Sequence, residues 1–159
     1  MALPTLRIIG FILGIFLITL AASMLLPLFA QLWYERTDEL GPFLWSSLAT
    51  FATGLALVLP GRPAEVHLRP RYMYLLTTAS WLVVALFAAL PMLMIRDLSY
   101  TDAFFESMSG ITTTGGTVLT GLDDASPGLL LWRSLLQWLG GIGFIAMAVA
   151  ILPLLRVGG

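Results

Sequence analysis

Four long runs without a charged residue dominate the hydrophobic pattern of the chain: Ile8–Tyr34, Leu40–Gly61, Tyr72–Ile95 and Ser134–Leu155. A helix that crosses the hydrocarbon core of a bilayer needs about 20 predominantly apolar residues, and each run reaches that length. Amphipathic aromatic rings favour the membrane interface, and such residues stand near the ends of the runs: Trp33, Tyr34, Trp45, Tyr72, Tyr74, Trp132 and Trp138. The pattern predicts an all-α membrane protein with four transmembrane helices.

The segment between the third and fourth runs combines a short apolar stretch with a threonine and glycine run. It reads DAFFESMSGITTTGGT from Asp102 to Thr117. Ser99 and Asp102 match a capping box, which predicts a helix from Tyr100 to about Gly110. Such a helix is roughly 16 Å long at 1.5 Å per residue. It reaches about halfway across a hydrocarbon core of about 30 Å.

The residues after this helix favour extended backbone. Thr112, Thr113 and Thr114 are β-branched and disfavour a continuing helix, and Gly115 and Gly116 permit positive φ. Non-helical backbone at membrane depth is tolerated only where it is buried in protein or lines a water-filled path. A row of carbonyls that replaces the hydration shell of an alkali ion uses such backbone. We therefore predict one re-entrant pore helix and filter loop, with these five residues as the ion-binding backbone.

Two other interpretations of this segment stay open. In the first it is an ordinary outer loop, because glycine and threonine are common in turns and Glu106 would simply be solvated. In the second, Asp102 and Glu106 are the carboxylate pair of an intramembrane enzyme. Helix capping explains these carboxylates better, and no span of the sequence holds a Ser/His, Cys/His or two-aspartate arrangement. We therefore expect no enzyme activity, no catalytic residue and no cofactor.

The composition supports a lipid environment. Of the 159 residues 58% are hydrophobic and only 11% are charged, and the mean hydropathy is +0.93, whereas soluble domains usually carry about a quarter charged residues. A net charge of −1 provides no basic field that would attract nucleic acid. Cysteine is absent and His67 is the single histidine, so metal catalysis would have to rest on carboxylates.

The distribution of arginine predicts the orientation, since the chain has no lysine. If the four runs alternate across the membrane, one side receives five of the arginines: Arg7, Arg62, Arg69, Arg71 and Arg156. The positive-inside bias places this side, and both termini with it, in the cytoplasm. The opposite side is acidic, which concentrates cations but also serves solubility. We interpret four of its carboxylates as an outer acidic mouth: Asp102, Glu106, Asp123 and Asp124.

Turn residues divide the chain into three parts. Residues 1–61 are predicted to form an N-terminal transmembrane hairpin, and residues 62–71 a cytoplasmic loop that proline punctuates. Residues 72–159 are predicted to form a helix–pore loop–helix repeat. The first run faintly resembles a secretory signal, but it continues well past Ser23, which favours a retained anchor.

The last run carries two smaller signals. Gly140, Gly141 and Gly143 form a small-residue face that favours close helix contact. Arg133 and Gln137 lie one turn apart at its outer end, where they either bond the pore loop or extend to the interface.

A resemblance to a known family depends on three segments in order. Asp102–Thr117 is followed by Gly121-Leu122-Asp123 and then by LLQWLGGIGFIAMAVAILPLLRVGG, which is Leu135–Gly159. These segments closely resemble the first pore repeat of TrkH-like proteins, in the Trk/Ktr/HKT superfamily of potassium transporters. The preceding helix pair resembles the N-terminal hairpin of the Trk branch, so the resemblance covers essentially the whole chain.

This resemblance implies potassium uptake across the bacterial plasma (inner) membrane, through four repeats that surround one ion path. The characteristic filter glycine of the family matches Gly115, and the carbonyls of Thr113, Thr114 and Gly115 would bind K+. The family commonly works with a cytosolic nucleotide-binding regulatory subunit.

One filter strand cannot enclose an ion, and three interpretations follow. A truncated or partner-dependent relative would obtain the remaining pore repeats from another chain. A homotetramer would obtain them from other copies, although four hairpins would crowd its perimeter. The third interpretation is a non-transporting membrane assembly or relic fragment that reuses the fold. The sequence leaves open K+ against Na+ selectivity and channel-like against coupled flux.

Overall fold

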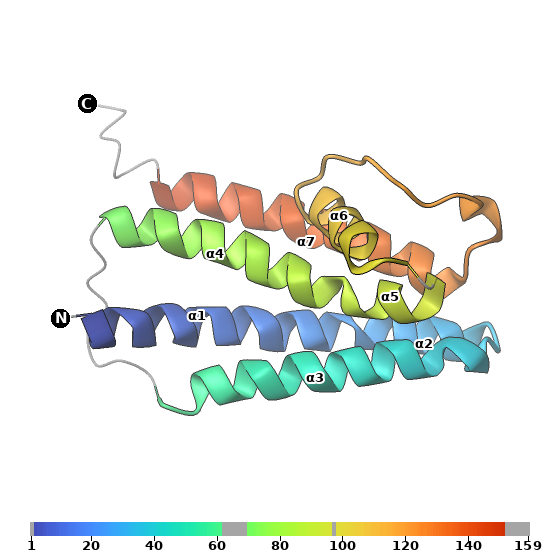
Figure 1. Cartoon of the computed structure of the whole chain (residues 1–159), viewed down its shortest axis with the longest axis horizontal. Coiled ribbons are helices and arrows are strands. Elements are labelled where there is room, and N and C mark those ends of the chain that lie inside the picture. Colours follow the sequence, from blue (N-terminus) through green and yellow to red (C-terminus); the bar gives the residue numbers. More distant parts are fainter. Residues whose placement is uncertain (1, 62–69, 97, 152–159) are drawn as a thin grey trace.

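The structure is a computed structural model that describes residues 2–61, 70–96 and 98–151 (Figure 1). All regular elements in these residues are helical, which confirms the predicted all-α class. The α-helices are α1 (Ala2–Ser23), α2 (Leu25–Trp33), α3 (Leu40–Val58), α4 (Pro70–Ala88), α5 (Leu90–Arg96), α6 (Tyr100–Ile111) and α7 (Pro127–Ile151). Two short 3₁₀ helices, η1 (Thr37–Glu39) and η2 (Leu122–Asp124), lie in the connections.

Four membrane spans are long and apolar enough to cross a bilayer among the described residues: Thr5–Trp33, Leu40–Val58, Tyr72–Arg96 and Pro127–Ala146. The first and third each join two helices that are separated by a break, at Met24 and at Ala89. Pro27 and Pro91 stand just after these breaks and are buried. Proline has no N–H and clashes with the carbonyl four residues earlier, which explains why each span is interrupted there.

The fourth span begins earlier than the predicted start at Ser134. Helix α7 begins at Pro127, and the hydroxyl of Ser126 accepts a hydrogen bond from the backbone N–H of Leu129 at 3.4 Å. Proline suits the first helical position, where its missing N–H has no intrahelical partner in any case. The charge of Arg133 suggested a boundary, but the helix contains this residue.

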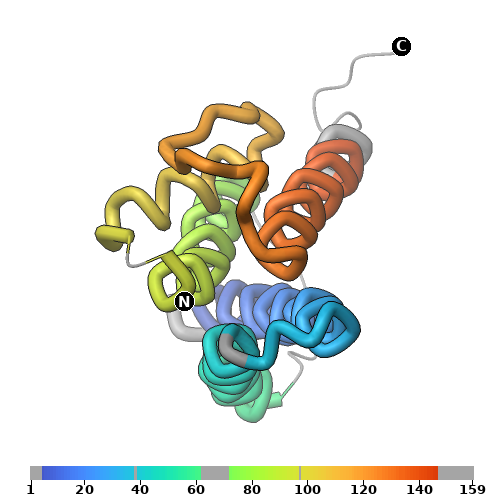
Figure 2. The backbone as a smooth tube through the Cα atoms, turned by 90° about the vertical axis from the view of Figure 1, so that its right-hand side faces the viewer, coloured from blue at the N-terminus to red at the C-terminus, as the bar shows by residue number. Residues whose placement is uncertain are grey.

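The spans pack in successive layers, with α3 at one edge and α6 at the other (Figures 1 and 2). Helix α1 crosses α3 so closely that a Cβ at Gly14 would stand 2.7 Å from the carbonyl oxygen of Gly54. The Ser47 hydroxyl donates to the carbonyl of Ala21 at 2.9 Å across the same contact. Glycine on both helices therefore sets the short distance between the first two spans.

The core joins these spans to α7. Trp132 is fully buried, meets Phe43 of α3 edge to face at 6.4 Å between ring centroids, and donates its indole N–H to the carbonyl of Ala88 at 3.0 Å. Gln31 of α2 is also fully buried; it accepts from the N–H of Gly128 at 3.4 Å and donates to Glu39 at 2.6 Å. The start of α7 is thereby fixed against α2, α3 and α4.

The predicted cytoplasmic loop at 62–71 falls mostly outside the described residues, as do His67 and the end of the last run beyond Ile151. Among the described residues, the start of α1, the end of α3 and the start of α4 lie at one end of the bundle (Figure 1). The end of α5 and the start of α7 lie at the other end, and α6 is seen nearly end-on between that end and the middle of the bundle.

Candidate functional site

Helix α6 is the short helix that the sequence predicts, and its cap has the expected form. Ser99 is the N-cap; its hydroxyl accepts from the backbone N–H of Asp102 at 3.2 Å and donates to the Asp102 carboxylate at 2.7 Å. The helix spans 12 residues and ends at Ile111, followed by Thr112. The carbonyls of its last turn point along the helix axis beyond Ile111.

The C-terminal end of α6 lies against the middle of α4 and α7. Gly140 is about 13 residues, or about 20 Å at 1.5 Å per residue, beyond the start of α7. A Cβ at Gly140 would overlap the carbonyl oxygen of Ile111, and a Cβ at Gly110 would come within 3.2 Å of Leu136. Gly140 thus makes the close helix contact that was predicted for the small-residue face of the last run. A Cβ at Gly141 or Gly143 would meet nothing within 4 Å in the described part of the chain.

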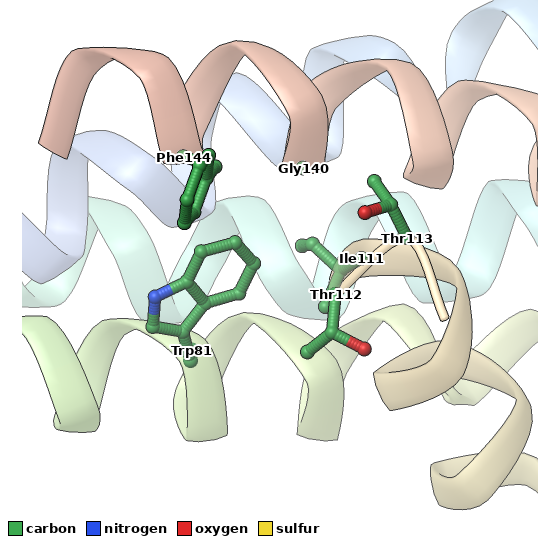
Figure 3. A pocket seen from close by; sticks show the side chains of 6 residues that line it. All are labelled: Trp81, Ile111, Thr112, Thr113, Gly140 and Phe144. Carbon is green, nitrogen blue, oxygen red and sulfur yellow. The ribbon is translucent and has the colours of Figure 1, made fainter. Parts of the chain in front are cut away.

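A cavity of about 360 Å³ opens beside this contact (Figure 3). The rings of Trp81 from α4 and Phe144 from α7 line it on one side, and the end of α6 lines it on the other. The polypeptide leaves α6 at this level and turns back. Residues 112–121 return without regular helix toward η2 and the start of α7.

The N–H groups of residues 112–115 all point back at the last turns of α6. They donate to the carbonyls of Met108, Ser109 and Gly110 at 2.9–3.4 Å. In a planar trans peptide the carbonyl points opposite to the N–H of the next residue. The carbonyls of residues 112–114 consequently point away from α6. The structure thus aligns three successive carbonyls of the predicted filter.

Positive φ angles make this turn. Gly115 has φ +78°, and Thr113 has φ +57°. A β-branched residue with positive φ is a genuine outlier, and the left-handed conformation costs about 1–2 kcal/mol for an L-residue. The contacts with α6 offset this strain at Thr113. At Gly115 a Cβ would have open space around it, so only the backbone angle favours glycine there.

Glu106 lies behind the returning strand and is only 2% exposed. Its Oε1 accepts from the Thr117 hydroxyl and from the backbone N–H groups of Val118 and Leu119, at 2.5–3.2 Å. Its Oε2 lies 3.2 Å from Nε of Arg133. The placement of Glu106 in an exposed acidic mouth is therefore wrong, because the strand and α7 enclose its carboxylate. Arg133 thus bonds to an acidic group of the predicted pore segment, which was one of its two predicted roles.

The other acidic residues of the predicted mouth lie closer to solvent. Asp102 is half-buried at the α6 cap, and Asp123 and Asp124 are exposed in η2. Arg96 donates to the carbonyl of Gly121 at 3.2 Å and so ties the end of α5 to the same loop. Arg96 and η2 therefore lie close together near the start of α7.

The sequence prediction missed Ser109. This residue is 6% exposed, and its hydroxyl donates to the carbonyl of Gly116 at 2.6 Å. A serine in a helix gives no pattern that indicates such a bond, because its hydroxyl usually serves its own helix. The oxygen of Gly116 thus faces α6, in contrast to the carbonyls of residues 112–114.

Comparisons with known proteins agree on one family. A family model described as TrkH, cation transport protein, matches residues 43–159. The Trk system potassium uptake protein TrkI of Halomonas elongata is 43% identical over 149 residues, which are 93% of this chain and 30% of that protein. The Trk system potassium uptake protein TrkH of Escherichia coli K12 is 40% identical over 156 residues, with 96% and 32% covered.

A solved structure gives the same result. The crystal structure of the potassium transporter TrkH from Vibrio parahaemolyticus matches with a TM-score of 0.89 and 38% identity. The match covers 97% of this chain and 33% of that one, so the chain spans about a third of the length of these relatives. Because the family model covers most of the sequence and the fold agrees along nearly all of it, the chain belongs to the TrkH family of cation transport proteins.

Proposed function

We propose that this chain contributes one filter strand to a potassium-uptake pore in the bacterial inner membrane. The observation that carries the proposal is the row of carbonyls of residues 112–114, which point away from α6 just before Gly115. Carbonyls in a row replace the water shell of an alkali ion. In this proposal Thr113, Thr114 and Gly115 supply the K+ ligands of the strand, and Thr112 lies at its base.

The placement of α6 supports a re-entrant pore helix. Its last residue lies against Gly140, near the middle of a span that is long enough to cross the bilayer. The strand that follows runs to the end of the bundle at which α7 begins. The negative end of the α6 dipole then lies near the membrane centre, where it favours a cation. An irregular strand at that depth is acceptable if it lines a water-filled path.

Asp102, Asp123 and Asp124 form the outer acidic mouth that concentrates cations before they enter. Both termini and the 62–71 loop face the cytoplasm, as the arginine distribution predicts. Residues 1–61 form the hairpin that anchors the repeat at 72–159. The ion is the transported substrate, and the transport requires no cofactor and no covalent chemistry.

The strand acts together with others, because one strand cannot surround an ion. The chain spans about a third of the length of its relatives, and other pore repeats supply the remaining strands, from another chain or from other copies. A cytosolic nucleotide-binding subunit is the regulatory partner that the family resemblance implies. A non-transporting assembly protein is the alternative that the experiment below tests.

A chimaeric transporter tests the proposal. Residues 1–159 replace the matching third of Escherichia coli TrkH, and this TrkH chimaera is expressed in a bacterium that lacks its own potassium uptake systems. We expect growth at low external potassium to be restored. A chimaera that reaches the membrane but restores no growth would contradict the proposed function. Expression of the chain alone, in parallel, shows whether copies of it suffice.

The filter glycine can be tested against a matched glycine. Gly115 and Gly121 both have positive φ and open space around a hypothetical Cβ, but only Gly115 lies in the proposed filter. Alanine at either position costs about 1–2 kcal/mol of backbone strain. We expect Gly115→Ala to lower rubidium uptake by the TrkH chimaera several-fold and Gly121→Ala to leave it nearly unchanged. Equal uptake by the two variants would contradict the proposed place of Gly115 in the ion path.

A further inference from the structure

The Ser109 hydroxyl makes its hydrogen bond outside its own helix, unlike the hydroxyls of several other helical residues in the described part of the chain. Ser80 and Ser134 donate to the carbonyl four residues earlier in their own helix, which is the usual local bond of a helical serine. The Ser109 hydroxyl instead donates to the carbonyl of Gly116 on the returning strand, at 2.6 Å. With 6% of the residue exposed, little water competes for this bond.

The backbone of Ser109 holds the same strand at a second place. Its carbonyl accepts from the N–H of Thr114 at 3.0 Å and from the N–H of Gly115 at 3.4 Å. Since the Thr114 carbonyl is opposite to the N–H of Gly115, it points away from α6. The Gly116 carbonyl points toward α6. The carbonyl direction therefore reverses across Gly115, where φ is +78°.

We propose that Ser109 is a positioning residue that ends the row of cation ligands at Gly115. The inference depends on the proposed function, and it removes the Gly116 carbonyl from the ligand set that the sequence predicted. The hydroxyl hydrogen, which carries a positive partial charge, lies beside the Gly116 oxygen and holds that oxygen on the α6 side. Ion selectivity depends on the number and field of the coordinating carbonyls or on the size of their cage, and Ser109 controls both at this end of the strand.

The hydrogen bond itself can be measured without any transport. Gly116-Thr117 is the single Gly-Thr pair in the sequence, so carbonyl-¹³C glycine combined with ¹⁵N threonine isolates the Gly116 carbonyl in an NMR spectrum of the purified chain. We expect Ser109→Ala to shift this carbonyl resonance and Ser109→Thr, which keeps the hydroxyl, to restore it. Ser107→Ala is the matched control, because Ser107 is buried on the same helix and its hydroxyl lies 3.8 Å from the sulfur of Met92 instead. If Ser109→Ala leaves the chemical shift of the Gly116 carbonyl unchanged, the inference is overturned.

The consequence for selectivity is measured in the TrkH chimaera as the ratio of rubidium to sodium uptake. We expect Ser109→Ala to lower this ratio several-fold, while Ser109→Thr and Ser107→Ala keep it near the value of the unsubstituted chimaera. An unchanged ratio in Ser109→Ala, together with a shifted Gly116 resonance, would overturn the role in selectivity. If the unsubstituted chimaera takes up no rubidium, the proposed function and the selectivity role both fail, whereas the NMR comparison still decides whether Ser109 holds the strand.

Discussion

Gly140→Ala is expected to abolish potassium uptake by the TrkH chimaera. The added Cβ would overlap the carbonyl oxygen of Ile111 and stand 2.6 Å from its carbonyl carbon and 3.0 Å from its Cα. All three atoms are backbone, so no flexible side chain can move aside. Overpacking of this kind costs about 1–3 kcal/mol or more. The overlap with the Ile111 backbone can be removed only if the end of α6 moves away from α7. The proposed filter strand begins at that end and would move with it.

Gly141→Ala is the matched control for this prediction. It lies next to Gly140 in the same helix, but its Cβ would meet nothing within 4 Å. Growth at low potassium is measured for both variants, with membrane levels from immunoblots and with protease sensitivity of the 112–121 segment. We expect normal growth and protection for Gly141→Ala, and lost growth with increased cleavage for Gly140→Ala. If the two variants behave alike, α6 does not depend on this contact.

Glu106→Ala is expected to be the most destabilising change within the site. It removes the acceptor of two backbone N–H groups and the partner of Arg133 at once. Deleting one partner of a buried ion pair costs about 3–5 kcal/mol, and the Arg133 side chain, which is 19% exposed, would be left mostly buried without its partner. The measurement is the free energy of unfolding of the purified chain in mixed detergent micelles. We expect the returning strand at 117–119 to lose its attachment to α6.

A double-mutant cycle with Arg133→Ala separates the ion pair from the bonds to the strand. The double variant should be less destabilised than the sum of the two single variants, because neither charge is then left alone. Asp102→Ala is the control: this carboxylate lies one turn earlier, is only half-buried and caps the helix through Ser99. Its loss should cost about 1 kcal/mol. A Glu106→Ala effect no larger than that would show that the buried carboxylate is dispensable.

Much of the fold follows from short-range patterns. Four uncharged runs predict the four spans, and their existence needs no tertiary information. The prolines at 27 and 91 lie where the first and third spans are interrupted. The capping box at Ser99 and the β-branched residues after Gly110 predict where α6 begins and ends, because both act within one or two turns.

The errors concern groups whose partners are distant in the sequence. Arg133 seemed to set a boundary for the last span, yet α7 begins at Pro127. Its charge is matched by Glu106, 27 residues earlier, and this pairing also buries the carboxylate that the sequence placed in the mouth. Gln31 bonds to Gly128, 97 residues away. No local sequence pattern predicts contacts between residues so far apart in the chain.

Ser109 was missed for a different reason. Its partner is only seven residues away, but the bond exists only because the strand reverses at Thr113 and Gly115. The sequence predicts extended backbone there without predicting which way each carbonyl points. That direction follows from the individual N–H partners, which are known only from coordinates.

The central claim is that a cation occupies the space beside residues 112–115, and cysteine protection tests it most directly. The chain has no cysteine, so Thr114→Cys gives a single thiol on an exposed residue of the proposed filter, in a TrkH chimaera that is otherwise free of cysteine. Thr120→Cys, exposed beyond the filter, is the control. The rate of modification by a membrane-impermeant methanethiosulfonate reagent is compared in potassium and in N-methylglucamine. We predict that potassium slows modification at position 114 and leaves position 120 unaffected; equal rates at position 114 in the two cations would contradict the claim.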